Sequence, residues 1–284
     1  MTDGRRTAVA PTRVLSVGDT GTLDRPDRVV TEEPMQIRVA SPGREAEPLV
    51  VTLRTPGADF ELAVGFLLAE GLVRSRDDVM SVAYCVEESD EQNYNVVTVT
   101  LRSPVDLDGH RRPFASTAAC GICGKRDVDD LDDLDDSCPP VAEGPVIAPG
   151  VVRSLPERIR GGQGVFDSTG GLHAAARFDR FGELLALRED IGRHNALDKL
   201  FGHALLAEEL PLSDQIVMLS GRMGFELVQK AAMAGVSVLT AVSAPSSLAL
   251  DAARHCGITV VGFLRDGRFN IYTGRQRIDT ESDG

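Results

Sequence analysis

The sequence predicts an α/β protein whose larger domain is built on a mainly parallel sheet covered by helices on both faces. Between residues 215 and 273, strand-like segments alternate with helical ones, and the strand-like segments are almost continuously apolar. Such alternation is typical of parallel strands that helices bury from both sides. The 284 residues also leave room for a second unit, because a chain of this length can bury more than one core. We therefore expect a smaller α+β subdomain before the main domain.

The smaller subdomain is predicted over residues 13–115, after a disordered tail that ends near residue 12. Apolar residues recur at helical spacing after residue 59, and Thr55 or Asp59 is the candidate helix cap. Segments rich in Val and Thr follow and are typical of paired strands. The expected elements are strands Met35–Val39 and Leu49–Arg54 around a turn at Ser41–Gly43, a helix over Phe60–Val73, and strands Val79–Val86 and Tyr94–Arg102.

The larger domain is predicted over residues 145–284. It opens with a helix and with two strands joined by the tight turn Asp179–Gly182, and a helix with a clean apolar stripe follows. The strand and helix alternation then runs to the end of the domain. The expected elements are helix Pro149–Arg160, strands Gly170–Phe178 and Glu183–Glu189, helix His194–Leu206, strand Gln215–Ser220, helix Phe225–Ala234, strand Val236–Val242, helix Ser246–His255, and strands Ile258–Leu264 and Phe269–Thr273.

Composition and charge exclude several classes of protein. Hydrophobic residues make up 42% of the chain and charged residues 26%, which is typical of a globular domain in water. No apolar run approaches the roughly 18 residues that span a bilayer, and the N-terminus lacks the apolar stretch of a signal peptide. The net charge of −13 argues against a general nucleic-acid binder, because such a surface does not neutralise phosphates. We expect a cytoplasmic protein with no membrane or nucleic-acid partner, in which the five cysteines are reduced, catalytic or metal-binding.

Two cysteines of the segment Thr117–Lys125 are the candidate catalytic residues. Cys120 and Cys123 stand two residues apart, flanked by Gly121 and Gly124, with Lys125 and Arg126 directly after. The glycines leave the backbone free and the thiols uncovered, and the cations favour the reactive thiolate. The pattern predicts a mobile loop that carries reactive sulfur.

The residues alone leave three kinds of chemistry open for this pair. A redox dithiol of the thioredoxin type usually opens a helix, which the following Gly-Lys-Arg-Asp does not resemble. A zinc site would need two more ligands, and although Cys138 and a histidine could supply them, no second ligand pair appears at zinc-finger spacing. A sulfur carrier would hold sulfane sulfur on the Cys120 thiolate.

Zinc nucleobase deaminase chemistry is excluded, since His173 is followed by two alanines and not by the H-x-E glutamate. Cys85 and Cys256 have apolar neighbours and are expected to be inert core residues.

The cysteine loop continues into a strongly acidic run, Asp127–Asp136. Blocks of like charge are usually solvated, so the main interpretation is an exposed face or hinge within a segment that we place at residues 116–144. The alternative is an acidic handle for a basic partner protein.

Three loops of the larger domain predict a site for a polyanion. They follow successive strands, and in an open parallel sheet ligands collect beyond the carboxyl ends of the strands. Two of them lead into helix N-termini, whose N–H groups favour anions, and serines and arginines are residue types that hold phosphate oxygens. We expect a nucleotide-like ligand there, against the alternative that Gly and Ser only make turns. The loops are Ser220–Gly224 with Arg222, Ser243–Ser247, and Arg265–Arg268.

His194 is a further candidate for the site. It lies in a strand-to-helix junction beside Asp190, Arg193 and Asn195, and polar residues clustered at such a junction are often functional. A capping or packing role is the alternative. His173 lies within an expected strand and is interpreted as structural.

Several of these segments, taken together and in order, resemble the formate dehydrogenase accessory sulfurtransferase family, FdhD. The resemblance runs from about residue 30 to residue 275. The segments that carry it are Thr55–Gly71, Cys120–Gly124, Thr169–Ala175, Glu189–Lys199, Ser220–Arg222, Ser243–Ala249, Gly262–Arg265 and Asn270–Thr273. The aspartate run after Cys123 departs from the family pattern.

The resemblance implies a sulfurtransferase with a persulfide intermediate. A cysteine desulfurase would load sulfur onto Cys120, with Cys123 assisting or releasing it, and the protein would pass the sulfur to a molybdenum bis(molybdopterin guanine dinucleotide) cofactor for formate dehydrogenase. The family's cofactor-binding segment corresponds to Phe263, Leu264, Arg265, Asp266, Gly267 and Arg268. The resemblance also implies a cytidine-deaminase-like three-layer domain, a homodimer, and a guanine nucleotide as a mimic of the cofactor. The alternatives are a cofactor-insertion chaperone that needs no thiols, and a zinc-binding regulatory module.

Overall fold

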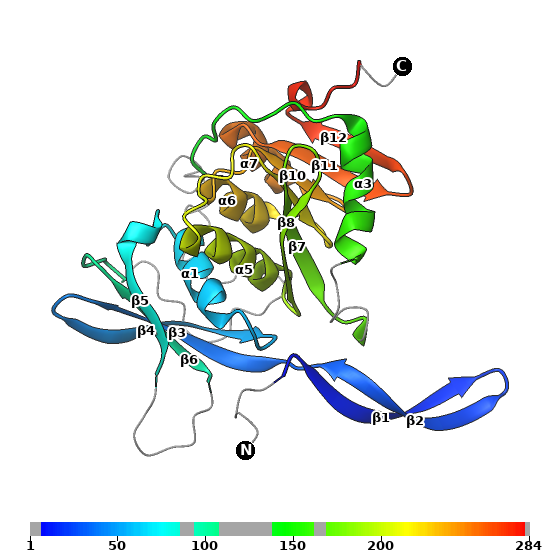
Figure 1. Ribbon diagram of the computed structural model, residues 1–284, viewed down its shortest axis with the longest axis horizontal. Coiled ribbons are helices and arrows are strands. Elements are labelled where there is room, and N and C mark those ends of the chain that lie inside the picture. Colours follow the sequence, from blue (N-terminus) through cyan, green and yellow to red (C-terminus); the bar gives the residue numbers. More distant parts are fainter. Residues whose placement is uncertain (1–6, 86–93, 108–137, 162–168, 282–284) are drawn as a thin grey trace.

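The structure, a computed structural model, describes residues 7–85, 94–107, 138–161 and 169–281 (Figure 1). Its described strands form three sheets of two, four and six strands. Cys120, Cys123 and the acidic run, together with the greater part of the segment predicted at 116–144, lie outside the described residues.

The chain begins with a hairpin that the sequence analysis missed. Strand β1 (Val9–Gly18) pairs with β2 (Gly21–Val30) along its whole length, through the two-residue turn Asp19-Thr20. The expectation of a disordered tail to residue 12 is therefore wrong from Val9 onward. Charged residues and two prolines hide the strand pattern here, but the Gly-Asp-Thr-Gly run at residues 18–21 is a hairpin signal that could have revealed it.

The four-stranded sheet confirms the strands expected in the smaller subdomain. Its order is β4-β3-β6-β5, with β3 parallel to β6 and the other pairs antiparallel. A short 3₁₀ helix, η1 (Arg76–Asp78), leads into β5. The strands are β3 (Glu33–Ser41), β4 (Arg44–Arg54), β5 (Val79–Tyr84) and β6 (Val96–Leu101).

Helix α1 (Asp59–Ala69) forms where expected but begins differently. Its N-cap is Ala58, in the left-handed region with φ 55°, and the cap makes no side-chain hydrogen bond. Neither predicted cap residue acts as one, because both are engaged elsewhere. The Asp59 carboxylate accepts from the Arg54 guanidinium at 2.9 Å, and the Thr55 hydroxyl accepts from the Ile191 amide at 3.2 Å.

The six-stranded sheet of the larger domain is mixed, which corrects the prediction of a mainly parallel sheet. In the order β12-β11-β10-β9-β7-β8, the strands β9, β10 and β11 run parallel to one another. Strand β7 pairs antiparallel with both β8 and β9, and β12 pairs antiparallel with β11. A run of three parallel strands and two flanking hairpins produces the same apolar pattern as a longer parallel sheet. The strands are β7 (His173–Phe178), β8 (Leu184–Asp190), β9 (Ile216–Leu219), β10 (Val238–Ala241), β11 (Thr259–Arg265) and β12 (Arg268–Thr273).

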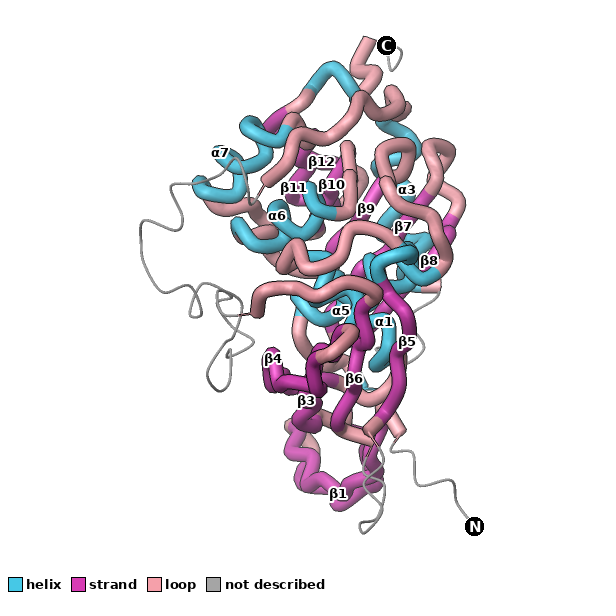
Figure 2. The backbone as a smooth tube through the Cα atoms, turned by 90° about the vertical axis from the view of Figure 1, so that its left-hand side faces the viewer, coloured by secondary structure: helices cyan, strands magenta, loops and turns pink. Residues whose placement is uncertain are grey.

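Helices cover both faces of this sheet, so the domain has three layers (Figures 1 and 2). Helix α3 (Pro149–Arg160) packs on one face through Val152, Leu155 and Ile159. On the other face lie α5 (Arg193–Leu206), α6 (Phe225–Met233) and α7 (Ser247–Cys256). The 3₁₀ helix η3 (Arg275–Arg277) follows β12.

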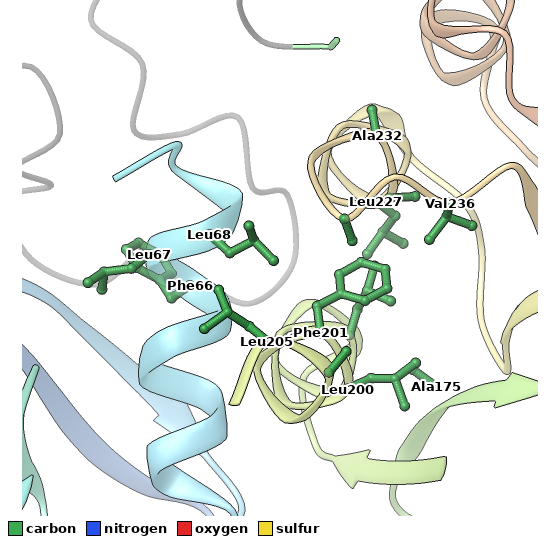
Figure 3. Packing of buried hydrophobic residues seen from close by; sticks show 14 of the residues in the cluster. Phe66, Leu67, Leu68, Ala175, Leu200, Phe201, Leu205, Leu227, Ala232 and Val236 are labelled. Atoms are coloured by element: carbon green, nitrogen blue, oxygen red, sulfur yellow. The ribbon is translucent and has the colours of Figure 1, made fainter. Parts of the chain in front are cut away.

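One buried hydrophobic cluster joins the two predicted domains. Helix α1 packs against α5, so apolar residues of the four-stranded sheet and of the helical layer belong to one core. The limit predicted at residue 115 falls within the part of the chain that is not described, and the limits at residues 115 and 145 both stay predictions. Figure 3 shows this cluster, with Phe66, Leu67 and Leu68 of α1 near Leu200, Phe201 and Leu205 of α5, and with Ala175, Leu227, Ala232 and Val236.

Among the described residues, no helix has the length and apolar character required to cross a membrane.

Candidate anion-binding cavity and its surroundings

The carboxyl ends of the parallel strands gather the three loops that the sequence predicted to converge. Because β8 runs in the same direction as β9, β10 and β11, the starts of α5, α6 and α7 also lie at this edge. Backbone hydrogen bonds tie the loops together. The Met223 amide donates to the Ala244 carbonyl at 3.1 Å, and the Ser246 amide donates to the Met223 carbonyl at 2.9 Å. The convergence of the first two loops is therefore confirmed.

The third loop joins the first two through an unusual backbone at Phe263. This residue has φ 52°, and the pairing of β11 with β12 shifts register between Gly262 and Arg265. A bulky residue in the left-handed region is uncommon and strained. Here the conformation aims the Phe263 amide at the Ser243 carbonyl, to which it donates at 3.1 Å. Beyond it, Asp266 (φ 54°) and Gly267 (φ 71°) close a tight hairpin turn.

A cavity of about 270 Å³ opens between helix α3 and these loops. Its volume lies at the lower end of the range for small-molecule sites, which suits a phosphate or pyrophosphate group better than a whole dinucleotide. The lining residues come from α3 and from the ends of β9, β10 and β11. They are Arg153, Pro156, Glu157, Ile159, Arg160, Met218, Ser220, Val242, Leu264, Arg265, Asp266 and Gly267.

The cavity is positively charged although the chain is acidic. Three arginines line it against two carboxylates, Glu157 and Asp266. Arginine presents several donors in a planar fork that matches phosphate oxygens. Two of the three arginines, Arg153 and Arg160, belong to α3 and were missed by sequence reasoning. Their spacing of seven residues, two helical turns on the predicted helix, was the signal that could have found them.

The predicted cofactor-binding residues fall into two groups. Leu264, Arg265, Asp266 and Gly267 line the cavity, and the Arg265 guanidinium lies 5.7 Å from the centre of the Phe263 ring. The other four, Phe263, Arg222, Arg268 and His194, do not line it. Arg222 and Arg268 are exposed at the same sheet edge, so their assignment to ligand binding stays a prediction.

His194 lies in the first turn of α5, on the helical side of the sheet away from α3. Its Nε2 is 3.3 Å from a carboxylate oxygen of Glu226, which stands in the first turn of α6. This contact joins the starts of two helices. The position fits a packing role, and a role toward a ligand at the edge stays a prediction.

His173 stands nearer to the edge loops than its predicted structural role implied. A Cβ at Gly221 would lie 3.2 Å from the His173 Nδ1 and 3.9 Å from the Arg193 Cδ. Glycine at this position therefore allows His173 of β7 and Arg193 of α5 to flank the loop after β9. Burial, followed by the positive charge of Arg193, lowers the pKa of His173, against an opposing effect of Asp190.

The other polar residues near His194 form a buried network that joins the two predicted domains. The Asp190 carboxylate accepts from the backbone amides of Thr55 and Gly192, at 3.0 and 2.8 Å. The Asn195 amide donates to Asp190 at 3.1 Å and to the Leu53 carbonyl at 2.7 Å. The cluster that the sequence marked as a functional candidate is thus, for Asp190 and Asn195, a structural connection.

The described cysteines do not form a metal site. Among the described residues there is no group of three or more His, Cys, Asp or Glu side chains that could hold a metal ion. Cys138 and Cys256 are both buried and hydrogen-bonded to each other, and this contact together with burial raises the pKa of the Cys256 thiol. The inert character expected of Cys256 agrees with this position, whereas Cys85 is only partly buried.

The fold and the cavity define a three-layer α/β protein with an arginine-lined cavity at the carboxyl edge of its larger sheet. Comparison with known proteins places it more closely. The chain belongs to the FdhD/NarQ family, whose sequence model matches residues 30–279.

Curated relatives agree over nearly the whole chain, and each is named sulfur carrier protein FdhD. The protein from Streptomyces avermitilis is 47% identical over 275 residues, covering 94% of each chain. That from Mycobacterium tuberculosis is 44% identical over 279 residues, covering 95% of this chain and 99% of the relative. That from Sulfurisphaera tokodaii is 40% identical over 252 residues, covering 89% and 92%.

A solved structure supports the fold. The crystal structure of a candidate formate dehydrogenase accessory protein from Desulfotalea psychrophila superposes with a TM-score of 0.73. The match covers 95% of this chain and 99% of that chain at 21% identity. The two proteins therefore share their overall fold.

Proposed function

We propose that this protein is a sulfur carrier for formate dehydrogenase, in which Cys120 holds the sulfur as a persulfide. The observation that carries the proposal is the membership of the family whose curated relatives are named sulfur carriers, together with the glycine-flanked cysteine pair of the sequence. Cations directly after the pair favour its thiolate form. Cys138 and Cys256, by contrast, are sealed in the core and serve no carrier role.

Loading is a thiol exchange with a cysteine desulfurase. The Cys120 thiolate attacks the outer sulfur of the donor's persulfide, the donor's S–S bond breaks, and the donor cysteine leaves as a thiolate. Release as sulfide requires two electrons, which the cysteine pair can supply. Attack by the Cys123 thiolate on the Cys120 sulfur forms a disulfide between them and expels HS⁻, and a cellular dithiol then restores both thiols.

The arginine-lined cavity supports a polyanionic receiver of this sulfur. Molybdenum bis(molybdopterin guanine dinucleotide) carries pyrophosphates, and a guanine nucleotide presents the same group. Arg153, Arg160 and Arg265 line a space of a size suited to that group. In this proposal the cofactor is the substrate that accepts sulfur before it reaches formate dehydrogenase.

The remaining expectations belong to the same proposal. The helical layer and the three parallel strands, each followed by a loop at one edge, support a cytidine-deaminase-like domain. We also infer a cytoplasmic location, because a cytosolic desulfurase and free thiols require a reducing compartment.

Mass spectrometry of the intact protein, after incubation with a desulfurase and cysteine, tests the proposal. We expect one added sulfur atom on the wild type, none on Cys120→Ala, and retained sulfur with slowed release on Cys123→Ala. Cys85→Ala is the matched control, since it removes a partly exposed thiol outside the loop. Formate dehydrogenase activity should be lost with Cys120→Ala. Full activity in that variant would instead identify the protein as an insertion chaperone that needs the cavity but not the thiols.

A further inference from the structure

A second cavity, of about 480 Å³, opens at the start of α1, the helix that packs between the four-stranded sheet and α5 (Figure 1). Its wall is formed by the starts of β3 and α1, the ends of β4, β5 and α5, and the segment before β6. Among the described lining residues, none is shared with the arginine-lined cavity. The volume lies within the range of small-molecule sites, so the space is large enough for a ligand of its own.

Three aromatic side chains line this cavity and contact one another. The ring centres of Phe60 and Tyr84 are 4.8 Å apart with the planes at 48°, and those of Tyr84 and Tyr94 are 5.1 Å apart at 86°. All three residues are only partly buried. The face of an aromatic ring carries a negative electrostatic potential that attracts a cation placed over it. This aromatic wall is therefore suited to a cationic group.

The one arginine of the wall is already occupied. Arg54 is buried, and its guanidinium donates twice to Asp59, at 3.1 and 2.9 Å, once to the Tyr94 carbonyl at 3.1 Å and once to Glu33 at 3.4 Å. These bonds use all but one of the N–H donors of a guanidinium. Arg54 therefore shapes the wall, and a ligand has to bring hydrogen-bond donors of its own.

Glu61 supplies the acceptor that such a ligand needs. One of its oxygens accepts from the Arg188 guanidinium at 2.8 Å and the other accepts from the Nε of the same group. A carboxylate has about four lone-pair positions, so each oxygen can accept once more. The carboxylates of Glu33, Asp59 and Glu61 also outnumber the two guanidiniums, of Arg54 and Arg188, with which they pair. The wall thus keeps a negative charge after its internal ion pairs are counted.

The start of α1 does not turn the cavity into an anion site. Helix N-termini attract anions through their free amides, but negative side chains in the first turn offset this effect. Here Asp59 and Glu61 both stand in the first turn of α1. The local charge therefore favours a cation.

The backbone of the wall is strained where it places these groups. Ala58 and Tyr94 both lie in the left-handed region, with φ 55° and φ 52°. This conformation is uncommon for a bulky residue, and such strain is concentrated at binding sites. Arg54 holds the Tyr94 carbonyl, and the Tyr84 hydroxyl donates to Asp59 at 3.1 Å. The buried Arg54–Asp59 pair thus fixes two of the three rings before a ligand arrives.

We propose that this cavity binds a guanidinium group, either of free arginine or of an arginine side chain of another protein. A planar guanidinium stacks on an aromatic ring while its N–H groups donate to a carboxylate. In the cavity it stacks on the aromatic wall and donates to Glu61. A lysine ammonium fits less well, because it is more strongly hydrated and cannot stack. The site involves no cysteine and is independent of the sulfur chemistry.

Tyrosine fluorescence of the full chain tests the proposal. The chain has no tryptophan, and two of its three tyrosines line this cavity. In a Tyr272→Phe background, Tyr84 and Tyr94 are therefore the only emitters. We expect a saturable change with N-acetyl-arginine amide, half complete below about 10 mM, and binding of N-acetyl-lysine amide that is at least roughly tenfold weaker. Equal binding of the lysine compound, no saturable change, or saturation by inorganic phosphate overturns the proposal.

Two further ligands distinguish the sources of the guanidinium. A blocked peptide Gly-Arg-Gly presents the side chain as a protein does, and free L-arginine presents it with both α-groups charged. Tighter binding of the peptide supports a protein side chain, and tighter binding of free arginine supports the small molecule. Failure of both to bind contradicts the site. No desulfurase is present, so the result does not depend on the role of Cys120.

Two substitutions at Phe60 separate the ring from its bulk. Phe60→Leu keeps an apolar side chain without a ring and should weaken arginine binding roughly tenfold, whereas Phe60→Tyr keeps the ring and should bind within about twofold of the wild type. Thermal unfolding without ligand shows whether each variant is folded. Wild-type affinity in folded Phe60→Leu would remove the aromatic wall from the site. The ligand comparison in the Tyr272→Phe background decides the proposal even if Phe60→Leu does not fold.

A matched pair of glutamates tests the acceptor. Glu61→Gln should weaken arginine binding roughly tenfold, because a hydrogen bond to a charged acceptor is lost. Glu183→Gln is the control, since Glu183 also pairs with an arginine, Arg158, at 2.6 Å but lies outside the cavity. It should bind as the wild type does. Unchanged affinity in Glu61→Gln, or equal weakening in both variants, overturns the assignment of Glu61.

Discussion

Asp190 and Lys199 form an ion pair of 2.7 Å in which both side chains are almost completely removed from solvent. Lys199 also donates to the Thr55 carbonyl at 2.8 Å, and Asp190 accepts from the Thr55 amide. The pair therefore holds the segment before α1 against the start of α5. It connects the four-stranded sheet to the helix layer that shapes the sheet edge.

Replacing Asp190 by asparagine should destabilise the protein severely. The change leaves the Lys199 ammonium buried without its counter-charge, and breaking a buried pair in this way costs about 3–5 kcal/mol. Chemical denaturation measures the loss. Asp251→Asn is the matched control, because the Asp251–Arg254 pair has the same 2.7 Å distance but side chains that are 61% and 59% exposed. That variant should change stability by less than about 1 kcal/mol. Similar losses in the two variants would contradict the structural role of Asp190.

Where α1 and α5 cross, replacing glycine by alanine should destabilise the protein far more than the same replacement elsewhere in a helix. A Cβ at Gly65 would lie 1.8 Å from the Asp198 carbonyl oxygen, and a Cβ at Gly202 would lie 1.8 Å from that of Glu61. The two helix backbones touch at these glycines, so neither helix can accept a methyl group without separating. Gly65→Ala or Gly202→Ala should cost about 3 kcal/mol or more.

Gly150→Ala provides the control for this crossing. Gly150 lies in the first turn of α3, and a Cβ there would meet no atom within 4 Å. Alanine is the better helix former, so the variant should be unchanged or slightly more stable. Thermal unfolding of the three variants distinguishes a steric effect from the helix preference of alanine. Equal shifts in all of them would show that the helices do not touch.

The sequence predicted the elements of the larger domain well because each has a clear apolar period. It could not predict partners that lie far apart in the chain. Thr55 was a reasonable helix cap locally, but its hydroxyl accepts from Ile191, 136 residues away. The tight turn between β7 and β8 indicated that these two strands pair with each other, but it did not indicate that β7 runs antiparallel to β9. An apolar strand has the same pattern in parallel and antiparallel pairing.

The cavity was predicted in part for the same reason. The rule that ligands collect at the carboxyl ends of parallel strands identified the loops, including Arg265. It did not identify α3, because no local pattern says which helix covers the opposite face of a sheet at that edge. Only the structure therefore showed that Arg153 and Arg160 line the cavity.

Substitution in the cavity should change nucleotide affinity in both directions. Loss of an arginine that donates to a phosphate costs about 1.5–3 kcal/mol, which is roughly 10- to 100-fold in Kd. We expect this of Arg153→Ala, Arg160→Ala and Arg265→Ala. Glu157→Gln removes a carboxylate from the same cavity and should tighten binding several-fold.

Calorimetric titration with a guanine diphosphate measures these affinities. Arg254→Ala, on the exposed side of α7, controls for the loss of a positive charge far from the cavity. Sulfur loading of Cys120 should be the same in every cavity variant, since the proposed donor enzyme would act on Cys120 and not on the cavity. If Arg254→Ala weakened binding and the cavity variants did not, the nucleotide would bind outside the cavity.

The two core thiols should resist modification in the folded protein. Cys138 and Cys256 are buried against each other, and the raised pKa of Cys256 keeps that thiol protonated. In a variant with Cys85, Cys120 and Cys123 changed to serine, iodoacetamide should label no cysteine under native conditions and both after denaturation. Rapid native labelling would contradict the buried position of these two thiols, and stoichiometric zinc in the wild-type protein would revive the metal-site alternative for Cys138.

The decrease in the free energy of unfolding at acidic pH should depend on His173. Burial and the charge of Arg193 lower its pKa from the ordinary value of 6.5. The unfolded chain therefore takes up a proton at a higher pH than the folded protein does. Stability is unaffected by this group well above pH 6.5 and falls as the pH drops through 6.5 toward the lower folded pKa.

His173→Gln keeps a polar side chain but cannot titrate, so it should flatten the loss of stability on acidification. The free energy of unfolding, measured by denaturant titration from pH 8 to pH 5, reports the slope. His255→Gln, on the exposed end of α7, controls for the substitution itself. His203 contributes in the same sense, because burial and the charge of Arg188 lower its pKa, and the His173→Gln/His203→Gln variant should flatten the curve further. A wild-type slope in His173→Gln would mean that Arg193 and the edge loops do not hold this imidazole in its neutral form.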